Sequence, residues 1–433
     1  MVRPPRRRTF LSRLAAVALA LPLPAAGQEG DPSRFPPAVV PGPVDVPVPP
    51  PSPPAARAPR EDLPEFLFRV AGFHEELTPE ERALLESRTF HWNLIPFILT
   101  NPLINFGGGV AAAGVFRLGS EETKLSKFTT DVLATVNQQI SIPFRTSIFF
   151  PGNDWSLVGF IDVKWFPSPT YGIGGNTPLA AETIVDYGLL RSWQTAYRCL
   201  FDSLYAGAGV YYDRYYSIGN QGPPAGYPNP FTSYPYGTSG PYRNVGASVD
   251  LLYETRDNPV NATRGTHASL TYRAFPTWLG STSSWQSLYA DARTYLGLPA
   301  PNVLALWAYG WFSFGNTPYL DLPSIGSDPD ARSGRGYIEG RHIGKSLLYA
   351  EAEYRFRIWE FLGGAAGLNV HSAAQPQAPG QAQNAPLFQY WYPAATVGLR
   401  VLVNRPSRAN GLVEFGMGLD GSRGFYLNIN ENF

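Results

Sequence analysis

The sequence predicts an all-β protein whose strands form a transmembrane antiparallel β-barrel. Charged residues make up 16% of the 433 residues, well below the roughly 25% of a typical soluble domain. Aromatic residues reach 14%, and beyond the N-terminus no apolar run approaches the ~20 residues that a spanning helix needs. Low charge, many aromatic side chains and no spanning helix together indicate strands that face lipid on one side.

Composition and motifs exclude several classes of function. Basic and acidic residues number 34 each, so no basic excess favours nucleic acid as a partner. The single Cys199 excludes an intramolecular disulfide framework and any multi-cysteine metal site. A G-x-S-x-G nucleophile elbow is absent. No HExxH or other paired spacing links the five histidines, which are His74, His91, His267, His342 and His371. We therefore expect neither an enzyme, nor a metal site, nor a cofactor.

Residues 1–27 have the pattern of a signal peptide. Five arginines precede the apolar stretch 14–23, and the small residues Ala25 and Gly27 favour cleavage before Gln28. We expect export through the general secretory route.

A proline-rich linker and one short helix are predicted next. Residues 28–64 contain 13 prolines, which favour extended polyproline II over a sheet. We interpret this segment as a periplasmic spacer, with a ligand for a periplasmic partner as the alternative. Residues 65–91 should hold a short N-terminal helix that begins at Thr78, with Pro79 and Glu81 completing a capping box.

Residues 92–433 alternate in the manner of barrel strands. A period of two, with apolar residues on one face and charges on the other, is typical of a strand between lipid and a wet interior. A soluble sandwich is the alternative, but its strands are about half as long. Aromatic residues also mark strand ends, as in the pairs Trp155/Trp165 and Trp278/Trp285. Residues 345–359 show the alternation best, with Ala350, Ala352, Tyr354, Phe356 and Ile358 opposed by Glu351, Glu353, Arg355 and Arg357.

Sixteen turn-bounded segments can be counted, an even number as in bacterial single-chain barrels. Pro96 and Pro102 interrupt the first segment, and glycines occupy 107–109. These residues weaken strand hydrogen bonding and predict a weak seam between the first and last strands. The segments are 92–100, 103–117, 126–139, 141–151, 154–166, 183–199, 201–216, 242–256, 264–276, 283–297, 302–314, 345–359, 362–371, 390–403, 409–420 and 422–433.

The last segment resembles the C-terminal signal that the barrel-assembly machinery reads in its clients. Phe425, Leu427, Ile429 and the terminal Phe433 fall on one face when residues are read in steps of two. Glu431 interrupts this face.

Two further stretches resemble the bacterial surface antigen superfamily, the outer-membrane barrels related to BamA and TamA. The first is Tyr-Glu-Thr-Arg-Asp-Asn-Pro at 253–259, followed by Thr-Arg-Gly at 263–265. The second is Arg335-Gly336-Tyr337, within the long connection 315–344. The eleven segments before this connection and the five after it match the family's arrangement.

The resemblance implies that the long loop folds into the barrel and is anchored there by Arg335. Glu353 matches the acidic partner position of the family, and Glu351 faces the same side. The next strand has Gly367 and Asn369 where the family has an aromatic residue and an aspartate, so Asn369 could offer only an uncharged acceptor. A solvated Arg335 is the alternative. Asp328 and Asp330 beside Arg332 could hold a cation, although a solvated acidic loop is favoured.

The resemblance further implies a protein of the outer membrane, in contact with its lipids, that assists assembly or translocation. Residues 28–91 are too short for the periplasmic domains of the longer relatives, so we expect a short form that works with a separate periplasmic partner. The alternative is a passive pore or a structural surface protein that keeps the barrel without insertase activity.

Overall fold

The computed structural model describes residues 90–99, 103–299, 301–374, 386–405 and 407–429, together with Leu63, Glu431 and Phe433. The predicted signal peptide 1–27 and helix 78–87 lie outside the described residues, as does the linker 28–64 apart from Leu63. Among the described residues, no helix is long and apolar enough to cross a membrane.

The described part of the chain is almost entirely β-structure, as predicted. Each of the sixteen predicted segments overlaps one strand of 7 to 19 residues. The sequence missed a seventeenth strand, the three-residue β6, which continues the line of β5 along β7. The strands are β1 (Phe90–Leu99), β2 (Gly107–Phe116), β3 (Ser126–Thr135), β4 (Ile140–Phe149), β5 (Trp155–Trp165), β6 (Ser168–Thr170), β7 (Thr183–Phe201), β8 (Leu204–Asn220), β9 (Tyr242–Glu254), β10 (Gly265–Phe275), β11 (Trp285–Gly297), β12 (Val303–Gly315), β13 (Ser346–Arg357), β14 (Leu362–Ala374), β15 (Tyr392–Asn404), β16 (Ala409–Gly418) and β17 (Arg423–Ile429).

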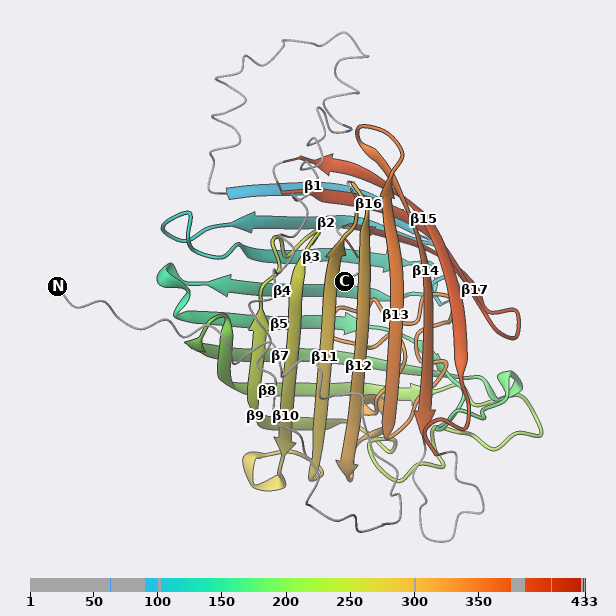
Figure 1. Cartoon of the computed structure of the whole chain (residues 1–433). Coiled ribbons are helices and arrows are strands. Elements are labelled where there is room, and N and C mark those ends of the chain that lie inside the picture. Colours follow the sequence, from blue (N-terminus) through green and yellow to red (C-terminus); the bar gives the residue numbers. More distant parts are fainter. Residues whose placement is uncertain are drawn as a thin grey trace, which may run out of the picture. The chain divides into compact units, whose positions relative to one another are not determined.

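All strands belong to one antiparallel sheet in which each long strand pairs with the next along the chain (Figure 1). Strands β1 and β17 lie next to each other, but no hydrogen-bonded register joins them among the described residues. A single sheet with this connectivity contradicts the sandwich alternative and agrees with the barrel class.

Successive connections lie at opposite ends of an up-and-down sheet. One end, which we call the short-turn end, carries tight turns such as 202–203, 298–302 and 358–361. The other, the long-loop end, carries the longest connections, including 221–241 and 316–345. We call residues 316–345 the long loop.

Side chains alternate between an apolar outer face and a polar interior. On β13, Glu351, Glu353 and Arg355 are buried, whereas Ala350 and Ala352 are exposed. The interior also contains a cluster of aromatic rings on β11, β12 and β13. On β13 the side chains therefore alternate between the two faces of the sheet as the period-two pattern predicts.

Trp285 lies at a strand end, as predicted, because it begins β11. Its side chain does not face outward, since it is only 6% exposed and points into the interior. Its ring stacks on Phe275 with a centroid separation of 4.1 Å, and its Nε1 donates a hydrogen bond to Asn244 Oδ1 at 3.1 Å. A buried indole needs such a partner.

The predicted common face of the C-terminal residues holds for Phe425 and Leu427 and is wrong for Phe433. Strand β17 ends at Ile429. Phe425 points outward and is 55% exposed, and Leu427 is half-buried, whereas Glu431 and Phe433 are buried in the interior. The physical reason is electrostatic, because Glu431 accepts a hydrogen bond from Arg400 at 3.0 Å and the Phe433 carbonyl accepts one from Arg355 at 2.9 Å.

The outer face provides a direct test of membrane insertion. Val249 lies midway along β9, is 64% exposed, and is flanked by Ala208 and Tyr272 on the neighbouring strands. Arginine at a lipid-facing midplane position costs about 2–4 kcal/mol. Val249→Arg should therefore lower the urea midpoint of the protein folded in lipid vesicles, while Thr232→Arg in the exposed connection 221–241 should not. Equal midpoints for the two variants would contradict a lipid-facing Val249.

Candidate functional site

The long loop folds into the interior of the sheet. It begins after β12 with the 3-10 helix η5 (Tyr319–Asp321), and its residues Ile325, Asp328, Arg335 and His342 are buried. The Asp328 carboxylate accepts backbone N–H groups from Asp330, Arg332 and Ser333 at 2.8–3.2 Å. Asp328 therefore shapes a turn by binding its own backbone.

Arg335 is the most heavily paired side chain of the loop. It is 2% exposed, and its guanidinium contacts three carboxylates on two strands. Nη2 donates to Glu353 Oε2 at 2.8 Å and to Glu351, and Nη1 donates to Glu414 Oε1 at 2.6 Å. The structure thus places Arg335 beside Glu353 and Glu351, in the interior rather than in solvent.

The two residues after Arg335 bring the loop backbone against the last strands. Gly336 has a φ of +107°, and a side chain there would lie 2.7 Å from the Ala394 Cβ, so this position requires glycine. Its N–H donates to Tyr426 Oη at 2.8 Å. The Tyr337 hydroxyl donates to the Pro393 carbonyl at 2.7 Å. All three residues of the motif therefore contact the sheet.

The carboxylates around Arg335 belong to a larger ionic network. Arg400 Nη2 lies 2.9 Å from Glu353 and 3.0 Å from Glu414, and Arg355 Nε donates to Glu353 at 2.7 Å. Each acid meets at least one arginine, so these buried charges are compensated. The network consists of Arg335, Arg355, Arg400, Glu351, Glu353, Glu414 and Glu431.

Sequence reasoning missed Glu414, Arg400 and Tyr426 as partners. Glu414 lies on the polar face of the alternating segment 409–420, a signal that placed it in the interior without identifying its partner. The role expected of Asn369 needs correction, because its Nδ2 donates to the Arg335 carbonyl at 2.9 Å and it accepts nothing from the guanidinium. Glu414 from β16 instead supplies the further carboxylate to Arg335.

The structure also joins two histidines that the sequence left scattered. His342 of the long loop and His371 of β14 are buried, with His342 Nδ1 2.7 Å from His371 Nε2. Tyr392 stacks on His342 at a centroid separation of 3.7 Å. The pair therefore fastens a second point of the loop to the sheet.

Solved structures of outer-membrane proteins are similar to this chain. CdiB from Acinetobacter baumannii is 11% identical over 79% of this chain and 60% of that chain, with a TM-score of 0.50. CdiB from Escherichia coli is 10% identical over 79% and 62%, also with a TM-score of 0.50. The chain shares their β-barrel fold. It spans about 60% of the length of those two proteins.

BamA from Haemophilus ducreyi, in a form lacking POTRA domains 1–3, is also among the similar structures. It is 10% identical over 79% of this chain and 69% of that chain, with a TM-score of 0.48. No family model and no curated protein sequence matches the chain.

Removal of the Arg335 guanidinium should loosen the long loop without unfolding the sheet. Breaking a buried pair by removing one partner costs about 3–5 kcal/mol, and Arg335→Ala would leave Glu351, Glu353 and Glu414 undercompensated. Limited proteolysis of the folded protein should cut the loop of this variant faster than that of the wild type. Arg335→Lys should rescue only in part, because an ammonium lacks the forked donor geometry.

A second substitution separates the ionic contact from a general loss of packing. Arg335→Ala combined with Glu414→Gln removes one of the carboxylates left undercompensated, so the double variant should lose less than the sum of the two single variants. Strictly additive losses would show that Arg335 and Glu414 do not interact.

The histidine pair should make the loop sensitive to pH. Burial lowers the pKa of His342, and the nearby His371 and Arg341 lower it further. A histidine whose pKa is depressed in the closed state stabilises that state above its normal pKa of about 6.5, and this stability falls as the pH drops below that value. The groups facing His342 are Arg341, His371, Tyr337 and Tyr392.

The shift from pH 7.5 to pH 5 should therefore weaken loop closure by up to ~2 kcal/mol. A nitroxide attached to cysteine at the exposed Ala331, in a Cys199→Ser background, should become more mobile at pH 5. His342→Phe keeps the ring stacking and should remove the pH dependence, and His267→Gln, at the short-turn end, should retain it. A pH-independent spectrum in the wild type would refute this account.

Proposed function

We propose that this protein is an outer-membrane β-barrel of the BamA and TamA type that assists assembly or translocation at the outer membrane. Residues 1–27 would direct its export. The short-turn end would face the periplasm, as in bacterial barrels generally, and the proline-rich segment 28–64 would reach a separate periplasmic partner.

The observation that carries this proposal is the attachment of one loop to both C-terminal strands. Arg335 binds Glu414 on β16, and the next peptide N–H binds Tyr426 on β17. These contacts couple the position of the long loop to β16 and to β17, the strand that lies next to β1. Movement of the loop would therefore change the edge at which the sheet begins and ends.

The seam between β1 and β17 supports the same reading. β1 pairs with β2 over its whole length, but it has no register with β17 among the described residues. A strand edge that is not hydrogen-bonded along its length is a template for pairing with another chain. Pro96 lies within β1 and removes one backbone donor from that strand.

The alternative, a passive or structural barrel without insertase activity, is favoured by one observation. The carboxylates around Arg335 are compensated by arginines, which stabilises the loop in its closed position. A barrel whose loop never leaves this position would assist no client.

Depletion of the protein in its bacterium distinguishes these two functions. If it assists assembly, the amounts of other folded outer-membrane proteins should fall, as measured by heat-modifiable mobility on gels. Wild-type protein and the exposed-site variant Arg243→Gln should restore them, and Arg335→Ala should not. Unchanged amounts after depletion would favour the passive barrel.

A disulfide across the seam tests whether β1 and β17 must separate. The only cysteine of the chain is Cys199, so Cys199→Ser provides a background for paired cysteines scanned along the two strands. An oxidised pair should abolish complementation and its reduction should restore it. Full complementation by a completely oxidised pair would exclude opening at this seam.

A further inference from the structure

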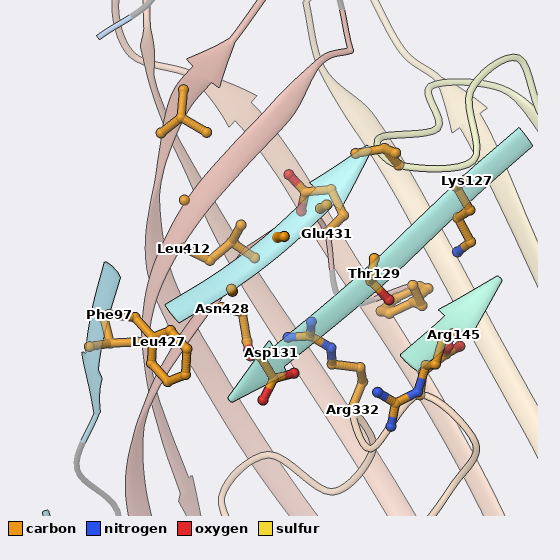
Figure 2. Close-up of a pocket in the computed structure, with 18 of the residues that line it drawn as sticks. Phe97, Lys127, Thr129, Asp131, Arg145, Arg332, Leu412, Leu427, Asn428 and Glu431 are labelled. Carbon is orange, nitrogen blue, oxygen red and sulfur yellow. The ribbon is translucent and has the colours of Figure 1, made fainter. Parts of the chain in front are cut away.

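A cavity of about 780 Å³ lies between the long loop, the first strands and the last strands. Its volume falls within the range of small-molecule sites. Figure 2 shows that its two ends differ in chemistry, with Phe97, Leu412 and Leu427 at one end and Lys127, Arg145 and Thr129 at the other. The cavity is therefore amphipathic.

The polar end has an excess of positive charge. Five basic and three acidic side chains line the cavity. Of the acids, Asp330 binds Arg293 at 2.8 Å and Glu431 binds Arg400 at 3.0 Å, and Asp131 lies two residues beyond Thr129 on the same face of β3. Of the bases, Arg256 and Arg293 pair with Glu254 and Asp291, which lie outside the lining.

Two of the cations have no carboxylate partner among the described residues. Lys127 Nζ forms no hydrogen bond or ion pair there. Arg145 donates Nε to the Pro329 carbonyl at 2.9 Å, and its guanidinium lies 4.5 Å from the centre of the Phe160 ring. Its two terminal nitrogens form no hydrogen bond with the described residues. Thr129 is the register partner of Arg145, with Lys127 two residues before it on the same face of β3. These side chains form a cradle for an anion with several oxygen acceptors.

The apolar end opens at the seam. Ile98 of β1 and Leu427 of β17 line the cavity from the two sides of the seam. Ile98 is 61% exposed on the outer face, and Val413, the register partner of Leu427 on β16, is 49% exposed there. The cavity therefore extends from the interior to the lipid-facing surface, between strands that share no register. A hydrocarbon chain could pass through this opening without burying a polar group.

The polar end of the cavity lies toward the short-turn end. Lys127 is the second residue of β3, and Arg256, Pro259 and Val260 of the β9–β10 turn also line the cavity. In the orientation of the proposed function, this end meets the periplasmic leaflet. The proposed function therefore determines only which leaflet the ligand comes from. Binding itself depends on the residues of the cavity.

We propose that the cavity binds one anionic phospholipid. The headgroup phosphate lies between Lys127 and Arg145, and an acyl chain runs past Leu412 and Leu427 to leave between β1 and β17. The site recognises both parts of the phospholipid. The cations bind the negatively charged headgroup, and the apolar end binds the acyl chain.

The test uses the full chain in detergent and measures bound lipid by native mass spectrometry, with phosphatidylglycerol and phosphatidylcholine of equal chain length as probes. The wild type should retain phosphatidylglycerol preferentially. Lys127→Gln with Arg145→Gln should lower its retention by about tenfold or more and abolish the preference. Arg423→Gln, an exposed arginine of β17 outside the cavity, is the matched control and should change neither.

The apolar end has its own matched pair on β17. Leu427→Gln should reduce phosphatidylglycerol retention, and Phe425→Gln, outside the cavity, should not. Equal retention of the two lipids by the wild type would overturn the proposal, and so would displacement by an equal concentration of glycerophosphate, which would indicate a site for free phosphate. Heat-modifiable mobility verifies that each variant is folded. Because binding is measured on purified protein, this result is independent of the depletion experiment.

Discussion

The burial of Arg335 among Glu351, Glu353 and Glu414 is the interaction on which the arrangement of the interior depends. A guanidinium without water requires carboxylates at fixed positions, and β13 and β16 provide them on their inner faces. This requirement fixes the path of the long loop. It also draws β16 and β17 into the same polar network, because Arg400 connects Glu414 to Glu431 beyond the last strand.

The same network explains why the C-terminus departs from a simple outward-facing pattern. Glu431 interrupts the apolar series when the sequence is read in steps of two, and in the structure it is the residue that turns the chain inward. Once Glu431 binds Arg400, Phe433 is carried into the interior, where its ring lies 5.2 Å from that of Trp307. Glu431 therefore interrupts the apolar alternation because its carboxylate pairs with Arg400 of β15.

The seam and the cavity beside it differ from this network, because fewer strand hydrogen bonds and ion pairs are found there among the described residues. β1 contains Pro96 and faces a β17 that ends at Ile429. Between these strands and the long loop, Lys127 and Arg145 have no carboxylate partner among the described residues. The buried charges of β13 and β16 are therefore paired within the protein, whereas the cations of β3 and β4 are available to bind a ligand.

The sequence by itself determined the strands and their faces, because a period of two records which side chains meet lipid and which meet the interior. It located sixteen strands and indicated Arg335 and Glu353 as a pair through the resemblance. Among the strands in the described part of the chain, it missed only the three-residue β6. Only the tertiary structure decided which charges meet. Glu414 reaches Arg335 across 79 positions of sequence, and His342 reaches His371 across 29. Alternation assigns a side chain to a face, whereas a contact depends on strand register and loop path. Neither can be read from one strand alone, because each is set by buried charges that meet from distant parts of the chain.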